Sequence, residues 1–469
     1  MKLKKLCLFL QFFLIVSSTH FSFEVLLNDR LVREWDDSLL PYCYDLPSGR
    51  GIPIFEILPL VIGDIDFQIV TEAGPVADVS RDSSIVWKDG CWKVEGFEDE
   101  GCLERLLSYG EPLEDRSLQI WLDWEGVREL KLLIQKFAAL HDLDLNVQEV
   151  PKASAKLKSM VRARGPVPDI LMVQSSDIAE LVWEEAIQAL DYLTTEGLSG
   201  LEAFTYEERL WAIPFYLDTQ LVFYNRGLVS DSEIRPEWTL EDFEDLSRDP
   251  ASGGAGWNIY SAYWFIPFQL GFGKLELIEQ ETLTIVDEPT EKALQYLVDR
   301  TVDGTFRVLE RDAMISLFTS NRLGIMLSGS YSIPEFLRIG LDFGIAPYPS
   351  PLRPILDYKG FAITRKTRNP VLSRRVIEYL TSERVEVVFC SSVSKIPSRS
   401  GAVDTMELHP AIEESLRRGY PVPTDPAYEL YKNTMWKLLG LAASGRLDVK
   451  TVLEQGQKII DESLREIGR

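Results

Sequence analysis

The stretch LWAIPFYLDTQLVFYNRG, residues 210–227, decides how we interpret this chain. It holds two apolar runs: residues 211–216 predict a strand that Pro214 interrupts, and residues 221–224 predict a second strand. Between the two runs lie three polar residues, Asp218, Thr219 and Gln220. A polar interruption where two buried strands join is typical of a segment that crosses between two lobes and faces a ligand. The alternative is an edge strand with a bulge at Pro214.

Length and charge narrow the class of protein. The chain has 469 residues, which is too long for one domain, and a formal net charge of -24. Such an acidic balance argues against nucleic-acid binding, which needs a basic surface. We find no H-E-x-x-H motif, no Walker loop and no Gly-rich dinucleotide turn, so we expect no metal and no cofactor.

The first 22 residues resemble a secretory signal. Three lysines precede a short apolar core, residues 6–16, and Val16-Ser17-Ser18 offers small residues for cleavage. The apolar core is too short for an ordinary membrane-spanning helix. We therefore expect a periplasmic or extracellular protein without a lipid anchor, although an uncleaved signal acting as an anchor is an open alternative.

Four cysteines follow this segment: Cys43, Cys91, Cys102 and Cys390. A secreted protein can form disulfides, and one bridge among the first three is expected, although the sequence does not give its connectivity. Cys390 follows an apolar run and is expected to be a small buried hydrophobic residue.

Two regions differ in their patterns. Residues 23–117 hold short apolar runs separated by Asp, Gly and Pro, with a hairpin turn at Lys88-Asp89-Gly90, and predict a small β-rich domain without an assigned role. From residue 118 the pattern alternates strand, helix, strand, helix, strand, up to residues 170–173. This rhythm is typical of a parallel α/β sheet, which binds ligands at the carboxyl ends of its strands.

The order of several passages resembles the extracellular solute-binding proteins of carbohydrate ABC transporters, the group that includes maltose-binding protein. The resemblance covers the chain from residue 118 onwards. The passages that carry it are a strand and long helix at residues 118–141, Pro168-Asp169-Ile170-Leu171, Trp211-Ala212-Ile213-Pro214 with residues 221–225, residues 238–243 (WTLEDF), residues 318–331, and Gly360-Phe361-Ala362-Ile363.

The resemblance implies a two-lobed, type II periplasmic-binding-protein fold of the α/β class, preceded by the β-rich domain. Lobe 1 would take residues 118–218 and 342–395, and lobe 2 residues 219–341 and 396–469. The chain would cross between the lobes first near residues 218–220 and again near residues 341–343. The resemblance also implies a monomer, not an enzyme, that closes on a sugar by hinge motion and docks on a membrane permease.

The resemblance also indicates which side chains would bind the sugar. Sugar sites combine aromatic faces with carboxylates or amides. The expected site residues are Asp123, Trp124, Glu125, Ser176, Asp177, Asp218, Tyr263, Trp264, Tyr331 and Trp436. Each has a structural alternative: the acidic residues after strands could cap helices, and the aromatic residues could belong to the core. Tyr331 stands where the family usually has Trp, and Ser175-Ser176 stands where sugar binders often carry bulkier polar groups. Both the identity of the sugar and whether the ligand is a sugar at all are therefore left open.

Two other functions fit the sequence. A secreted carbohydrate hydrolase could use a pair of carboxylates, and acidic residues are plentiful. A Ser-His-Asp triad is poorly supported, because only His141 and His409 follow the signal. The second alternative is a solute-binding fold retained as a sensor or scaffold, with the N-terminal region as its docking module.

Overall fold

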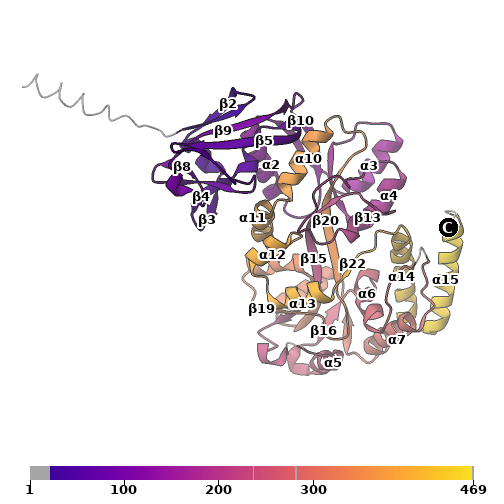
Figure 1. The fold of residues 1–469 in the computed structure, drawn as a ribbon. Coiled ribbons are helices and arrows are strands. Elements are labelled where there is room, and N and C mark those ends of the chain that lie inside the picture. The colour runs from indigo at the N-terminus through magenta and orange to yellow at the C-terminus, as the bar shows by residue number, and fades with distance from the viewer. Residues whose placement is uncertain (1–21, 236, 280–281, 467–469) are drawn as a thin grey trace, which may run out of the picture. The chain divides into compact units, whose positions relative to one another are not determined.

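The computed structural model describes residues 22–235, 237–279 and 282–466 (Figure 1). The expected signal, residues 1–22, lies almost entirely outside the described residues. None of the helices in the described ranges has the length and apolar character of a membrane-spanning segment. The chain divides into two compact units: residues 1–117 with 134–145, and residues 118–133 with 146–469.

The first unit is built from β-sheets. One sheet has the strand order β2-β1-β9-β5-β6, and another has the order β3-β4-β7-β8. Asp89 and Gly90, both with positive φ, form the turn between β7 and β8, so the predicted hairpin is confirmed. The strands are β1 (Phe23–Leu27), β2 (Arg30–Trp35), β3 (Tyr44–Leu46), β4 (Gly49–Pro53), β5 (Val61–Thr71), β6 (Gly74–Val76), β7 (Ser84–Lys88), β8 (Cys91–Val94) and β9 (Leu103–Pro112).

A disulfide and a buried ion pair hold the first unit together. Cys91 is bonded to Cys102, so the expected bridge is present, and Cys43 is a free thiol. Helix α2 (Val127–His141) begins in the second unit, and its second half belongs to the first. Its Lys136 ammonium lies 3.2 Å from the Glu56 carboxylate, which is fully buried. The first unit is thus completed by a helix that starts directly after the predicted site residues 123–125.

The second unit contains one long mixed sheet. Its strands follow the order β11-β10-β12-β20-β15-β18-β16-β17, with β19, β21 and β22 paired beside this path. The parallel pairing of β10 with β12 confirms the predicted α/β rhythm. The strands of this sheet are β10 (Ser117–Leu122), β11 (Asp144–Glu149), β12 (Ile170–Gln174), β15 (Ile213–Asn225), β16 (Ala255–Trp257), β17 (Phe306–Val308), β18 (Ile325–Gly329), β19 (Phe343–Ala346), β20 (Ile355–Ile363), β21 (Ile396–Pro397) and β22 (Tyr420–Pro421). Strands β13 (Thr205–Tyr206) and β14 (Arg209–Leu210) form a separate two-stranded sheet.

Strand β15 joins the two halves of this sheet, and all its residues are buried (Figure 1). The prediction of two separate strands is wrong, because residues 213–225 form one strand. The edge-strand alternative is also wrong, because β20 and β21 pair with the same segment of β15. Its bulge is nevertheless present, since the register with β20 shifts between Pro214 and Tyr216. Proline cannot donate a ladder hydrogen bond, so a bulge is where a central strand tolerates it.

The return of the chain comes later than predicted. Strand β19 pairs with Val222–Asn225, the same part of β15 that β18 pairs with. The expected crossover near residues 341–343 is therefore wrong. The chain returns to the first half of the sheet only in β20, which pairs with residues 213–219 of β15 and with β12.

Helices flank this sheet. Those of eight or more residues besides α2 are α3 (Ala153–Arg162), α5 (Leu240–Arg248), α6 (Ala262–Gly271), α7 (Glu288–Val302), α8 (Arg311–Thr319), α10 (Pro370–Leu380), α11 (Glu383–Val393), α13 (Pro410–Arg418), α14 (Ala427–Ala443) and α15 (Val449–Glu466) in the described residues. Shorter ones are α4 (Ile178–Trp183), α9 (Ile333–Arg338) and α12 (Ser400–Met406). Cys390 on α11 is fully buried, as expected.

Candidate functional site

The loop after β10 carries the first three predicted residues. Asp123 accepts hydrogen bonds from the backbone N–H of Trp124 at 2.8 Å and of Ala153 at 3.1 Å. Because Ala153 begins α3, Asp123 has the helix-capping role that was the alternative to a site role. Trp124 has a left-handed backbone, with φ of 65°, and is half-buried. Glu125 is exposed and points to the Lys395 ammonium, 3.3 Å away.

Asp218 lies at the centre of β15 and is 3% exposed. Its carboxylate accepts hydrogen bonds from Lys395 Nζ at 2.8 and 3.0 Å and from Ser330 Oγ at 2.8 Å. Burial alone would lower the pKa of Lys395, but the charges of Asp218 and Glu125 outweigh it and raise that pKa above its ordinary value. Lys395 therefore stays charged inside the protein, and the two groups form a buried ion pair.

A second ion pair lies beside the first on the same face of the sheet. Asp357 on β20 is the cross-strand partner of Asp218 on β15. Its carboxylate is 2.7 Å from Lys359 Nζ and accepts a hydrogen bond from Gln174 Nε2 at 2.8 Å. Like charges directly opposite in a sheet repel, so each carboxylate needs its own cation. This face of the sheet therefore carries four charged side chains, in the spatial order Lys395, Asp218, Asp357, Lys359. We call these four residues the crossover cluster.

Aromatic groups lie around the crossover cluster. The Lys359 ammonium is 5.5 Å from the centre of the Trp124 ring, a cation–π distance. The Tyr263 carbonyl on α6 accepts a hydrogen bond from Gln220 Nε2 at 2.7 Å. Burial raises the pKa of Tyr263, and interactions with Asp357, Tyr331 and Asp218 raise it further. The structure thus brings Trp124 to Lys359 and the Tyr263 backbone to Gln220, two residues after Asp218 on β15, and Tyr331 directly follows Ser330, which donates to Asp218.

No described contact joins the side chains of the other predicted residues to the crossover cluster. Ser176 is buried, and Asp177 accepts a hydrogen bond from Ser154 Oγ on α3 at 2.7 Å. Burial raises the pKa of Asp177, although that hydrogen bond opposes the increase. Trp264 is 9% exposed and packs edge-on against Tyr263. Trp436 on α14 is 64% exposed, and no described contact joins it to the crossover cluster.

Two fully buried hydroxyls in this part of the second unit have no hydrogen-bond partner among the described residues. They belong to Tyr216 on β15, two residues before Asp218, and Ser175, which directly follows β12. Both residues are fully buried. An unsatisfied buried hydroxyl is costly, and a ligand hydroxyl can satisfy it.

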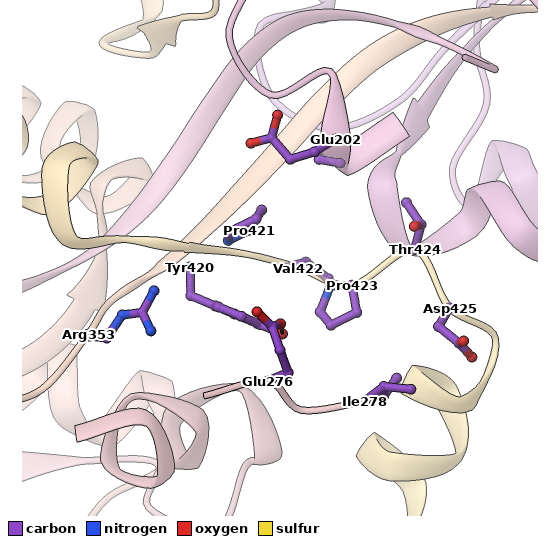
Figure 2. A pocket seen from close by; sticks show the side chains of 11 residues that line it. Glu202, Glu276, Ile278, Arg353, Tyr420, Pro421, Val422, Pro423, Thr424 and Asp425 are labelled. Carbon is purple, nitrogen blue, oxygen red and sulfur yellow. Dashed lines mark hydrogen bonds between the residues drawn. The ribbon is translucent and has the colours of Figure 1, made fainter. Parts of the chain in front are cut away.

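A separate pocket of about 490 Å³ lies beside β22, and Figure 2 shows Glu202, Glu276 and Asp425 around it. Its wall includes Pro421, Val422 and Pro423. It contains none of the predicted site residues. Within the described ranges, no group of three or more His, Cys, Asp or Glu side chains is arranged to hold a metal ion.

Sequence reasoning missed Lys395, Lys359, Asp357 and Gln174. The rule of ligands at strand ends does include Gln174, in the run Gln174-Ser175-Ser176-Asp177, but Gln174 was not among the expected site residues. Asp357 and Lys359 alternate on one strand, which indicates a shared face but not which face. Lys395 gave no local signal, because the strand that follows it is only two residues long.

Comparison with known proteins identifies the family. The profile of the family described as "Bacterial extracellular solute-binding protein" matches residues 133–414. A galactooligosaccharide-binding protein of Bacillus subtilis (strain 168) is 24% identical over 379 residues, covering 72% of this chain and 87% of that protein. A maltotriose-binding protein of Pyrococcus abyssi is 23% identical over 229 residues, covering 46% of this chain and 49% of that protein.

Solved structures share the fold. The maltotriose-binding protein of Thermus thermophilus superimposes with a TM-score of 0.64 and 22% identity, covering 74% of this chain and all of that chain. The GacH receptor of Streptomyces glaucescens gives a TM-score of 0.66 and 18% identity, covering 75% and 98%. The predicted two-lobed type II fold is therefore confirmed. Since the family profile spans more than half of the sequence, this chain belongs to the bacterial extracellular solute-binding proteins.

Proposed function

We propose that this protein captures a sugar or oligosaccharide between its two lobes and delivers it to the membrane permease of an ABC transporter. The observation that carries the proposal is the crossover cluster, which is flanked by Trp124 and includes Asp218 on the strand that joins the two halves of the sheet. Hinge closure around a ligand is a common motion of two-lobed binding proteins. The proposed location is periplasmic or extracellular.

The chemistry of the cluster supports a sugar. Aromatic rings stack on the apolar face of a sugar ring. Carboxylates accept hydrogen bonds from its hydroxyls, and amides both accept and donate them. Trp124 and Tyr331 supply the rings, and Asp218 and Gln174 supply the polar groups. The relatives named above are described as binding galactooligosaccharides and maltotriose, which supports the same class here.

We propose binding without chemical turnover. The two carboxylates that oppose each other, Asp218 and Asp357, are each held by a lysine ammonium. A glycosidase needs one carboxyl group free to donate a proton. A sensor or scaffold role is the second candidate, because the family profile begins only at residue 133 and leaves the first unit's sheets without a family assignment.

Thermal unfolding of the mature chain against a panel of mono- and oligosaccharides tests the proposal. A ligand that binds only the folded state stabilises it by about 2.7 kcal/mol at a hundredfold excess over Kd. We expect one class of neutral sugar to raise the unfolding temperature, without any change in the sugar when the mixture is analysed by chromatography. A flat panel would favour the sensor or scaffold role, and sugar cleavage would favour the hydrolase.

A further inference from the structure

The position of Lys395 depends on a very short strand. In the pairing of β21 with β15, Pro397 is opposite Tyr216 and Ile396 is opposite Leu217. Continuing this antiparallel register by one residue brings Lys395 opposite Asp218. A slip of one residue in such a pairing turns every side chain to the other face of the sheet. The buried ion pair therefore requires a fixed register in a strand of two residues.

The residues before β21 fix the register of this strand only in part. Helix α11 ends at Val393, and Ser394 follows in a left-handed conformation, with φ of 53°. The Lys395 N–H donates to the carbonyl of Cys390 at 3.0 Å. After β21, the Ser398 N–H donates to the Phe215 carbonyl at a long 3.3 Å. Several groups hold the far end of the strand: the Ser398 carbonyl accepts hydrogen bonds from the N–H and the Oγ of Ser199, both at 2.8 Å, and the Arg399 guanidinium donates to the carbonyls of Thr381 and Glu196.

Glu386 on α11 adds a hold that connects this end to the helix preceding β21. Its carboxyl group is fully buried and accepts hydrogen bonds from Ser398 Oγ at 3.0 Å and from the Arg399 N–H at 2.8 Å. These bonds tie the two residues after β21 back to the helix that precedes it. Residues 386–399 thus form a loop that is closed at both ends, with Lys395 inside it.

We infer that Glu386 is a positioning residue for the candidate site: its carboxyl group fixes the register of β21 and so keeps the Lys395 ammonium on Asp218. Among the described residues, no contact joins Glu386 to Asp218 or to the aromatic residues of the candidate site, so it acts through Lys395. The expected effect of Glu386 on sugar affinity rests on the proposed function. Its expected effect on the position of Lys395 is independent of that function.

The clamp depends on pH. Burial raises the pKa of Glu386 to about 8, against the hydrogen bonds from Ser398 and Arg399 and the charge of Arg399. The charge of Glu386 also raises the pKa of the Cys390 thiol on the same helix. N–H and O–H groups bond more strongly to a carboxylate than to a neutral carboxyl group. The clamp is therefore tighter at pH 9 than at pH 7.

Acetylation of lysines followed by mass spectrometry tests the inference on the whole chain. Lys359 is the internal reference, because it is also buried and paired with an aspartate. We expect Glu386→Gln to raise the ratio of Lys395 to Lys359 acetylation at least tenfold. In the wild type this ratio should fall between pH 7 and pH 9, and in Glu386→Gln it should not change. Glu383→Gln, an exposed carboxyl group on the same helix, is the matched control and should match the wild type.

The outcomes separate the inference from the proposed function. An unchanged Lys395 ratio in Glu386→Gln would overturn the inference, as would an equal rise at Lys359. A selective rise with no sugar bound by the wild type would support the positioning role and contradict the sugar function. If the wild type binds a sugar, Glu386→Gln should weaken the affinity for that sugar at least threefold. Unchanged sugar affinity together with an exposed Lys395 would overturn the expected link between Lys395 and sugar binding. Should Glu386→Gln not fold, Ser398→Ala, which removes one donor, provides the same measurement.

Discussion

Replacing Lys395 with methionine tests the buried ion pair at the centre of the site. Methionine keeps most of the length and volume of lysine but removes the charge. The side chains of Lys395 and Asp218 are 1% and 5% exposed, so the substitution leaves a buried carboxylate without its cation. Removing one partner of a buried ion pair costs about 3–5 kcal/mol. The hydrogen bond from Ser330 remains and supports the lower end of that range.

The loss of the second contact of Lys395, with Glu125, adds little to the decrease in the free energy of unfolding. Glu125 has a side chain that is 61% exposed, and an ion pair with an exposed group is worth about 1 kcal/mol or less. We therefore expect Lys395→Met to lower the free energy of unfolding by about 3–4 kcal/mol. Urea unfolding followed by circular dichroism and tryptophan fluorescence measures this change in the second unit.

Two further variants make the test specific. Lys292→Met removes an ion pair with Glu288 in which both side chains are exposed, and should cost under about 1 kcal/mol. The double variant Lys395→Met with Asp218→Leu removes both charges and should recover most of the loss, because no uncompensated charge remains. A loss for Lys395→Met no larger than for Lys292→Met would refute the reasoning, as would additive losses in the double variant.

Three other perturbations test separate parts of the structure. Reduction of the Cys91–Cys102 disulfide, whose cysteines are 11 residues apart, should lower the stability of the first unit by up to about 3 kcal/mol, as urea unfolding with and without reductant would show. Lys136→Met should destabilise the same unit by about 3 kcal/mol, because the fully buried Glu56 carboxylate loses that cation; an unchanged urea midpoint would contradict this. Gly329→Ala should weaken sugar binding and lower the free energy of unfolding by about 1–3 kcal/mol, because the new Cβ would lie 2.1 Å from the Tyr331 ring. Sugar affinity and thermal unfolding measure the two effects, and an unchanged affinity would exclude Tyr331 from the site.

Local sequence patterns predicted the structure where neighbouring residues alone determine it. Alternating strands and amphipathic helices between residues 118 and 173 predicted the parallel pair β10 and β12. The rule that ligands lie past strand ends then placed Trp124 near the site, and the polar interruption in an apolar stretch placed Asp218 there. Each of these inferences needs only residues that are close in the sequence.

The missed features depend on pairing between distant segments. Pro214 was expected to break the strand, but β20 and β21 pair on both sides of β15 and accommodate it in a bulge. Lys395 lies 177 residues from Asp218 in the sequence, so no local pattern links them. A tryptophan on a helix can face the core, a ligand or solvent, and the sequence around Trp436 did not show that it is 64% exposed.

Isothermal titration calorimetry with the sugar that stabilises the chain most tests the central claim, that the ligand binds at the crossover cluster. The comparison uses one substitution at two positions: Trp124→Ala, beside the cluster, and Trp436→Ala, exposed and apart from it. We predict that Trp124→Ala raises Kd at least tenfold, about 1.4 kcal/mol, while Trp436→Ala leaves it unchanged. Equal affinities of Trp124→Ala and the wild type would place the sugar elsewhere and contradict the account.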